Sequence, residues 1–360
     1  MYIHEKRNWP EFMWNSEVIA TKLGAVRHRQ GRILGQMQGL GFRLREETML
    51  KALTMDVVKS SEIEGELLNP EQVRSSIARR LGIEIAGTVA AERHVEGIVE
   101  MMLDATQQYD APLTEVRLFD WHAALFPTGR SGMFKINVGA WRDGSMQVTS
   151  GPMGKETVHF EAPNAGKVPD EMERFLNWMD APHDIDPVLK AAIAHLWFVT
   201  IHPFDDGNGR VARAITDLQL ARADQSTQRF YSMSAQIQSA RNAYYDILES
   251  TQKGDLDITP WMEWFLDTLM QAMEQTDETI ERTFFRAAFW ENHRDTSLNA
   301  RQQKVLGLLL DDFFGKLNVS KYAKITKTSS DTALRDLKDL VDKNVLEQQG
   351  AGRSTFYQLK

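Results

Sequence analysis

The spacing of apolar residues along the first hundred positions constrains the fold of this chain more than any other feature. From about Glu17 to Met101 apolar residues recur at helical spacing, without the alternation of a half-buried strand, so two or three long helices are expected. Asn69 and Pro70 mark a helix start, because asparagine caps free amides and proline suits the first helical turn. Asp186 and Pro187 open another helix, the mostly buried run VLKAAIAHLWFVTI. These patterns predict a mainly α protein.

The region from 112 to 183 differs, because Pro112 and several glycines divide it into short pieces. Two segments there, Met146–Thr149 and Thr157–Phe160, have a β-leaning pattern and are separated by a Gly-Pro-containing turn. Such a pair predicts a small β-hairpin. A helix from about Val168 to Met179 is expected to follow it.

The last part of the chain reads as a separate module. Residues 298–314 form one amphipathic helical pattern and 329–346 another, with a short polar link between them and a strand-like GAGRSTFYQL behind them. Helix, turn, helix and hairpin are the plan of a winged helix. Residues 297–360 carry 11 Lys and Arg against 7 Asp and Glu, in a chain whose net charge is −8. We therefore expect an N-terminal helical region over 1–110, a central domain over 111–290 and a winged-helix domain over 297–360.

Composition excludes several classes of function. The chain has no cysteine, so disulfides, thiolate zinc sites and a cysteine nucleophile are absent. Its acidic balance argues against a generally basic nucleic-acid binder. No H-E-x-x-H spacing is present, which disfavours a zinc hydrolase. Neither a signal peptide nor an apolar run of about 18 residues is found, so no membrane partner and a cytoplasmic location are expected.

One string, His202-Pro-Phe-Asp-Asp-Gly-Asn-Gly-Arg-Val-Ala-Arg213, suggests chemistry. Pro203 disfavours helical torsions at His202, which should end the preceding helix and leave the imidazole as a candidate base. The Gly-Asn-Gly that follows can take positive φ and turn its amides toward an anion, with a new helix expected from Arg210.

The charged residues of this string suggest a phosphate ligand. Arg210 and Arg213 share one helix face, so both can reach one polyphosphate. Asp206 would repel that ligand unless Mg²⁺ bridges them, and magnesium favours one carboxylate plus substrate phosphates. Taken singly, each residue fits an ordinary turn or a structural histidine. Together they favour a phosphate site.

The whole string matches HxFx[D/E]GNGRxxR and resembles the signature of the Fic family. The resemblance implies a Fic-type helical bundle that transfers AMP from ATP to hydroxyl side chains (Ser, Thr or Tyr) of target proteins. It implies that His202 takes the proton of the target hydroxyl, that Asp206 holds Mg²⁺, and that Phe204 anchors the loop. The phosphates of ATP would be held by Gly207, Asn208, Gly209, Arg210 and Arg213.

Two further segments have a family look. The hairpin resembles the Fic flap, along which a target protein pairs by main-chain hydrogen bonds, with Met146, Gln147, Val148 and Thr149 as its first strand. Gly139, Trp141 and Arg142 precede it. Tyr244 and Tyr245, with Asn242 nearby, would line the adenine pocket, although a helix buried by two tyrosines accounts for them equally well.

An inhibitory pattern also lies upstream. Ser60-Ser-Glu-Ile-Glu64-Gly65 matches [S/T]xxxE[G/N] of Fic proteins, in a helix expected around 55–66. The resemblance implies that Glu64 pairs with Arg213 and removes its phosphate contact. A solvated helix end is the simpler interpretation. Some relatives use such a glutamate to remove AMP, and the sequence does not assign the direction.

Two other functions compete with AMP transfer. One is a Fic enzyme that uses another nucleotide-linked donor. The other is a nucleotide-sensing transcription regulator whose winged helix binds DNA through Lys327, Arg335, Lys338 and Arg353. Four aspartates in the second helix of that module oppose DNA, and a protein partner is the alternative. A homo-oligomer is compatible with the sequence.

Overall fold

The computed structural model describes the whole chain except residues 40, 86, 152–154, 156, 311–312, 314 and 353–354, and except the side chains of residues 283 and 287. It is mainly helical, with small antiparallel strand pairs, as the sequence predicts. The chain divides into two compact units, residues 1–276 and 277–360. The boundary expected at residue 110 lies inside the first unit, and the expected 297–360 module lies inside the second.

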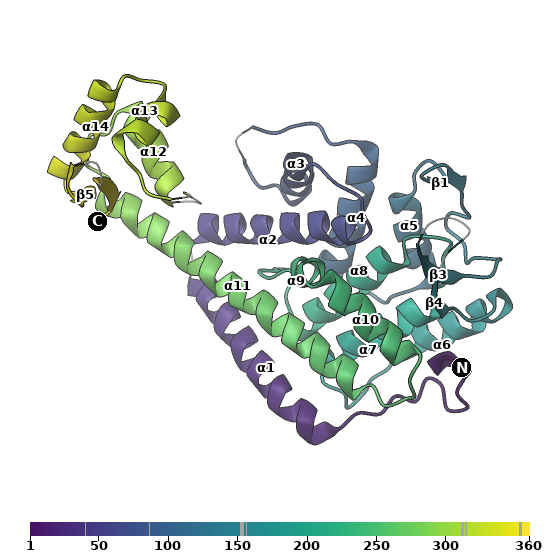
Figure 1. The fold of residues 1–360 in the computed structure, drawn as a ribbon. Helices are drawn as coiled ribbons and strands as arrows, with labels where there is room; N and C mark the ends of the chain where they lie inside the picture. The colour runs from purple at the N-terminus through teal and green to yellow at the C-terminus, as the bar shows by residue number, and fades with distance from the viewer. Residues whose placement is uncertain are drawn as a thin grey trace. The chain divides into compact units, whose positions relative to one another are not determined.

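The first unit begins with a 3₁₀ turn and four helices, η1 (Ile3–Glu5), α1 (Ser16–Gly39), α2 (Phe42–Ile63), α3 (Pro70–Leu81) and α4 (Arg93–Gln107). The predicted start of α3 is confirmed, because Asn69 Oδ1 accepts a hydrogen bond from the amide of Glu71 over 2.9 Å. α1 runs beside the first part of α11 (Thr259–Asn292), and Lys22 Nζ lies 2.6 Å from Asp267 Oδ1 (Figure 1).

The middle of this unit holds α5 (Glu115–Leu125), a short pair β1 (Arg130–Ser131) and β2 (Phe134–Lys135), and the expected hairpin. In that hairpin β3 (Gln147–Ser150) pairs antiparallel with β4 (Thr157–Glu161), with a register shift between Val148 and Thr149. Pro152 and Gly154 of the predicted Gly-Pro turn lie outside the described residues. The turn η2 (Ala165–Lys167) and α6 (Val168–Asp180) follow, close to the predicted helix.

Two adjacent helices form the centre of the first unit, α7 (Pro187–Ile201) and α8 (Asn208–Asp224), which pack along each other (Figure 1). Every residue of α7 from Leu196 to Ile201 is buried, as its uniformly apolar sequence predicts. α9 (Met233–Ser239) packs against α2, and α10 (Arg241–Gln252) leads into α11. The two central helices therefore hold both ends of the segment between them.

The second unit contains the end of α11, three helices and a hairpin: α12 (Ala300–Leu310), α13 (Val319–Thr326), α14 (Ser330–Asp342), β5 (Leu346–Gln349) and β6 (Phe356–Leu359). The expectation of a mere polar link between the two predicted helices was wrong, because α13 lies there. The core of the second unit includes Leu306, Tyr322, Leu337 and Tyr357. Asp311, Asp312 and Phe314, which the first helical pattern included, lie outside the described residues.

Candidate active site at the junction of α7 and α8

The backbone between α7 and α8 makes a tight turn. α7 ends at Ile201, as Pro203 predicts, and His202 adopts left-handed torsions of φ 54° and ψ 58°. Gly207 has φ 80°, which favours glycine. α8 begins at Asn208, so the expected helix start at Arg210 was wrong. Of the Gly-Asn-Gly residues only Gly207 has positive φ, because Asn208 and Gly209 already belong to the helix.

His202 is held in a state suited to accept a proton. Its Nδ1 lies 3.1 Å from the carbonyl oxygen of Val199, which can only accept, so Nδ1 carries the hydrogen and Nε2 keeps its lone pair. Burial lowers the pKa of His202 below its usual 6.5, so the ring is neutral at pH 7. Arg142 fixes the backbone here by donating from Nε to His202 O over 2.7 Å and from its amide to Pro203 O over 2.8 Å.

The loop is closed by the side chain of Asn208. Its Oδ1 accepts from the amide of Phe204 over 2.9 Å, and its Nδ2 donates to the carbonyl of Phe204 over 2.8 Å. Phe204 is fully buried and its ring stacks on His122 with centroids 4.2 Å apart. Asn208 thus shapes the loop through its side chain.

Asp206 is oriented by three neighbours. Its Oδ1 accepts from the amide of Gly207 over 2.6 Å, and its Oδ2 accepts from the hydroxyl of Ser131. His122 Nδ1 accepts from the amide of Gly139 over 3.2 Å, so its Nε2 is the donor to Asp206 O, also at 3.2 Å. Burial lowers the pKa of His122 to about 4, which keeps this ring neutral. Among the described residues no three carboxylates or imidazoles gather as a metal cage.

Arg213 contacts the predicted inhibitory segment directly. Its Nε donates to Ser60 Oγ, and its Nη2 donates to Ser60 O and to Glu64 Oε1, each over 2.8 Å. Arg213 is 2% exposed and the Glu64 side chain 32%. A Cβ placed on Gly209 would overlap Glu64 Oε1, so glycine makes room for this carboxylate beside α8.

Arg210 has a partner that the sequence reasoning did not identify. Its Nη1 donates to Glu66 Oε2 over 2.9 Å, and its guanidinium lies 5.0 Å from the centroid of the Phe126 ring. Arg210 Nε and Arg213 Nη1 are buried and have no hydrogen-bond acceptor within the described part of the chain. The one signal in the sequence was a second glutamate directly after Glu64-Gly65.

The three residues considered for an adenine pocket differ in how far they are buried. Thr216 Oγ1 donates to Ala212 O and so accepts from His195 Nδ1, which leaves His195 Nε2 to accept from the Tyr244 hydroxyl over 2.8 Å. Tyr244 is therefore a core residue, 2% exposed. Tyr245 is half-buried under the guanidinium of Arg241, and Asn242 is exposed. The structural interpretation fits Tyr244 better than a pocket wall.

The hairpin is anchored through its second strand. His159 Nδ1 lies 2.7 Å from Glu249 Oε2 on α10, and the buried ring of Phe160 packs edge-on against Tyr2. Gln147 and Thr149 of β3 are exposed, Val148 is half-buried, and Met146 lies just before the strand. Met146 O accepts from the amide of Ala162 over 3.0 Å.

Comparison with known proteins gives the class of this site. Residues 112–220 match the model of the Fic/DOC family, and residues 2–83 match a domain of unknown function (DUF4172). The chain therefore carries a Fic/DOC domain, which confirms the resemblance of its motif.

Named relatives agree with this assignment. Protein adenylyltransferase Fic of Drosophila yakuba and that of Culex quinquefasciatus are each 33% identical over 114 residues, or 31% of this chain. The matched region spans 21% of those proteins, about a fifth of their length. A Fic family protein from Desulfovibrio desulfuricans G20 shares the fold over 97% of both chains, with 22% identity and a TM-score of 0.55. Fic-1 from C. elegans covers 74% of each chain with 18% identity and a TM-score of 0.51.

Proposed function

We propose that this protein transfers AMP from ATP to a hydroxyl side chain of a target protein, and that Glu64 holds the reaction back by pairing with Arg213. One observation carries the proposal. Two buried arginines in the first turns of α8 each have an unsatisfied donor, and the turn that leads into α8 begins at a histidine whose Nε2 lone pair is free to accept a proton. An unsatisfied buried donor costs about 1–3 kcal/mol, and phosphate oxygens would satisfy it.

The reaction divides between the residues as follows. The target oxygen attacks the α-phosphorus, a new P–O bond forms, and the bond to the bridging oxygen of the β-phosphate breaks, so diphosphate leaves. His202 Nε2 takes the hydroxyl proton. The first-turn amides of α8 and the two arginines hold the phosphate oxygens in line with the attack.

The donor set near Gly207 fits a Mg²⁺ ion that takes one protein carboxylate and completes its shell with phosphates and water. Asp206 would hold it, since each of its oxygens makes one hydrogen bond and keeps a further lone pair. The ion would neutralise charge on the leaving diphosphate.

The target would bind along the hairpin. Within the described residues β3 pairs only with β4, so its outer edge can pair with an extended segment of another protein.

No helix of the described residues is both long and apolar enough to cross a membrane.

Labelled ATP tests this proposal. Wild type, Glu64→Gly and Glu64→Gly/His202→Ala proteins are incubated with Mg²⁺ and ATP labelled at the α- or the γ-phosphate, and label on protein is measured. We expect transfer of α-label alone, strong in Glu64→Gly and lost in the double variant. Transfer of γ-label, or no transfer in Glu64→Gly, contradicts the proposal.

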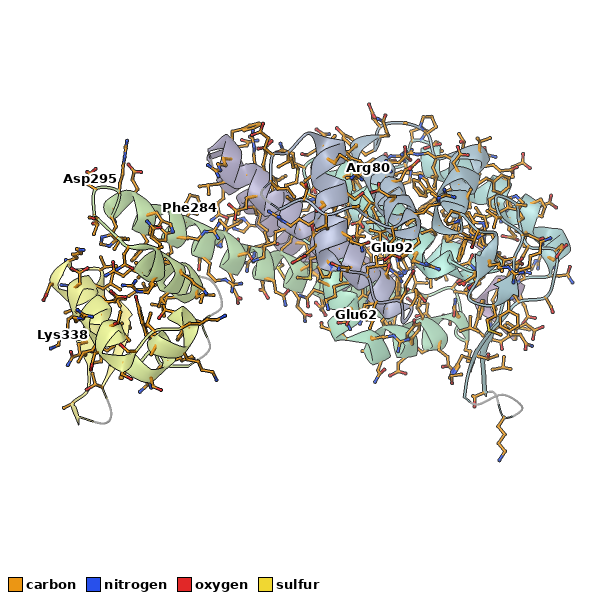
Figure 2. The ribbon with its side chains drawn as sticks, turned by 90° about the horizontal axis from the view of Figure 1, so that it is seen from above. Glu62, Arg80, Glu92, Phe284, Asp295 and Lys338 are labelled. Atoms are coloured by element: carbon orange, nitrogen blue, oxygen red, sulfur yellow. The ribbon has the colours of Figure 1, made fainter. Side chains whose placement is uncertain are left out.

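A second candidate function, the binding of duplex DNA, concerns the second unit. Two of the four aspartates expected to oppose DNA have partners within the unit: the buried Asp336 accepts from Arg301 Nε over 2.7 Å, and the partly exposed Asp339 accepts from Gln302 Nε2 over 2.7 Å. Lys327, Arg335 and Lys338 are exposed (Figure 2 labels Lys338), and Arg353 lies outside the described residues. This unit would then act as a winged helix.

Fluorescence anisotropy with a labelled duplex tests the DNA function. Binding that weakens steeply as salt rises, and that Lys338→Glu weakens further, would support it. An absence of duplex binding at low salt would contradict the DNA function and favour the alternative, in which this unit binds a protein partner.

A further inference from the structure

The pairing of Glu66 with Arg210 is as close as the pairing that the sequence predicted. Glu66 Oε2 and Arg210 Nη1 are 2.9 Å apart, and the Arg210 side chain is 8% exposed while that of Glu66 is 35% exposed. The ring of Phe126 lies against the same guanidinium. Arg210 is thus largely removed from water, and Glu66 supplies its compensating charge.

The chain reaches this position through one turn. α2 ends at Ile63, and Gly65 takes φ 84°, a left-handed value that side chains other than glycine rarely adopt. The amides of Gly65 and Glu66 then bond back to the carbonyls of Glu62 and Ser61, each over 3.0 Å. This reversal carries the residues on both sides of Gly65 toward α8, so that Glu64 meets Arg213 and Glu66 meets Arg210.

We propose that Glu66 is a second inhibitory carboxylate, which competes with the nucleotide's polyphosphate for Arg210. The inference rests on the proposed function, because it assigns Arg210 to phosphate binding. Two carboxylates then occupy the two arginines of the motif, and a triphosphate must displace both. Removal of Glu64 alone frees Arg213, but Glu66 still occupies Arg210.

Glu66 could instead hold Arg210 in position for phosphate, and the two roles predict opposite changes in triphosphate affinity when Glu66 is removed. If Glu66 only positioned the guanidinium, its loss would weaken triphosphate binding. If Glu66 occupies the phosphate position, its loss strengthens that binding. AMP, which lacks the β- and γ-phosphates, separates a phosphate effect from a general opening of the pocket.

Calorimetric titration measures this directly. The full chain is titrated with AMP and with an ATP analogue in which a methylene group replaces the α,β-bridging oxygen, both with Mg²⁺. The variants are Glu66→Gln, Glu66→Asp, Glu64→Gln and Glu64→Gln/Glu66→Gln. Glu100→Gln serves as the charge-matched control, because Glu100 pairs with Arg80, 3.1 Å away, outside the motif (Figure 2 labels Arg80). Thermal unfolding establishes that each variant is folded, and Glu66→Asp retains the charge with a shorter reach.

We expect Glu66→Gln to bind the triphosphate analogue about tenfold more tightly than wild type, with AMP affinity and the Glu100→Gln control unchanged. The double variant should bind more tightly than either single variant. If Glu66→Gln binds the triphosphate analogue as well as wild type or more weakly, while Glu64→Gln binds it more tightly, the inhibitory role of Glu66 is overturned and the proposed function stands. No binding by any variant, including Glu64→Gln, overturns both.

Discussion

Oε1 of Glu64 lies 2.8 Å from Nη2 of Arg213, although 149 positions separate the two residues in the sequence. The same guanidinium donates to Ser60, so a single arginine of α8 holds the C-terminal end of α2 at two points. An ion pair in this position links a segment of the N-terminal region to α8, the helix that carries the second half of the motif. Its effect on the reaction depends on whether Arg213 is needed for phosphate.

Glu64→Gly is expected to raise self-modification at least tenfold. Loss of the carboxylate leaves a buried guanidinium that phosphate oxygens can take as their partner. The measurement is the rate at which α-labelled ATP labels the protein. Glu62→Gln is the control, since Glu62 (labelled in Figure 2) lies on the same segment, and its side-chain partners within the described residues are Gln238 Nε2 at 2.9 Å and Lys59 Nζ at 2.5 Å. An equal rise in both variants would mean that loosening α2, and not freeing Arg213, causes the activation.

His202→Ala, made in the Glu64→Gly background, is expected to lower the transfer rate by about 10²–10⁴-fold, the usual contribution of a general base. Within the described part of the chain the ring makes one hydrogen bond, to Val199 O, so the melting temperature should change little. Nucleotide affinity should also persist, because the proposed function assigns the phosphate contacts to α8 and not to His202. Transfer at an undiminished rate would show that another group accepts the proton.

Local signals in the sequence predicted much of this site. The pairing of Glu64 with Arg213 followed from the family resemblance and not from a local pattern. Pro203 predicted the end of α7, and Asn69 and Asp186 predicted the starts of the helices that they cap. Each of these depends on neighbours within a turn or two, where backbone torsions and helix periodicity decide the outcome.

Other contacts could not be predicted, because they depend on tertiary packing. Nothing in the sequence places Ser131 on Asp206 or Glu66 on Arg210, which are 75 and 144 positions apart. The eight residues of α13 were too few for a clear apolar period, and their tyrosine is buried only in the assembled unit. Tyr244 was ambiguous for the same reason, since the burial of its hydroxyl against His195 is decided by two other helices.

Asn208→Ala is expected to destabilise the fold by about 2 kcal/mol. The substitution removes both hydrogen bonds to the Phe204 backbone and leaves that buried N–H and C=O without partners. Urea unfolding compared with wild type measures the change. Asn242→Ala is the control, because Asn242 is exposed and its removal should cost less than about 0.5 kcal/mol. A loss confined to activity would mean that Asn208 serves phosphate binding and not the shape of the loop.

His122 is expected to make the fold sensitive to acid. Its pKa is about 4 in the folded chain and about 6.5 when unfolded, so below pH 6.5 the unfolded state binds the extra proton. The stabilisation from keeping this ring neutral is complete above pH 6.5 and is lost as the pH falls toward 4, up to about 3 kcal/mol.

His122→Gln, which retains a donor for Asp206 O, should reduce the dependence of unfolding free energy on pH by about one proton in this range. Urea titrations at several pH values between 4 and 7.5 measure that slope, which is independent of any constant loss of stability. His195, with a pKa of about 3, adds a similar dependence in both proteins, so only the difference between them belongs to His122. Equal slopes would show that the pKa of His122 is not lowered in the folded chain.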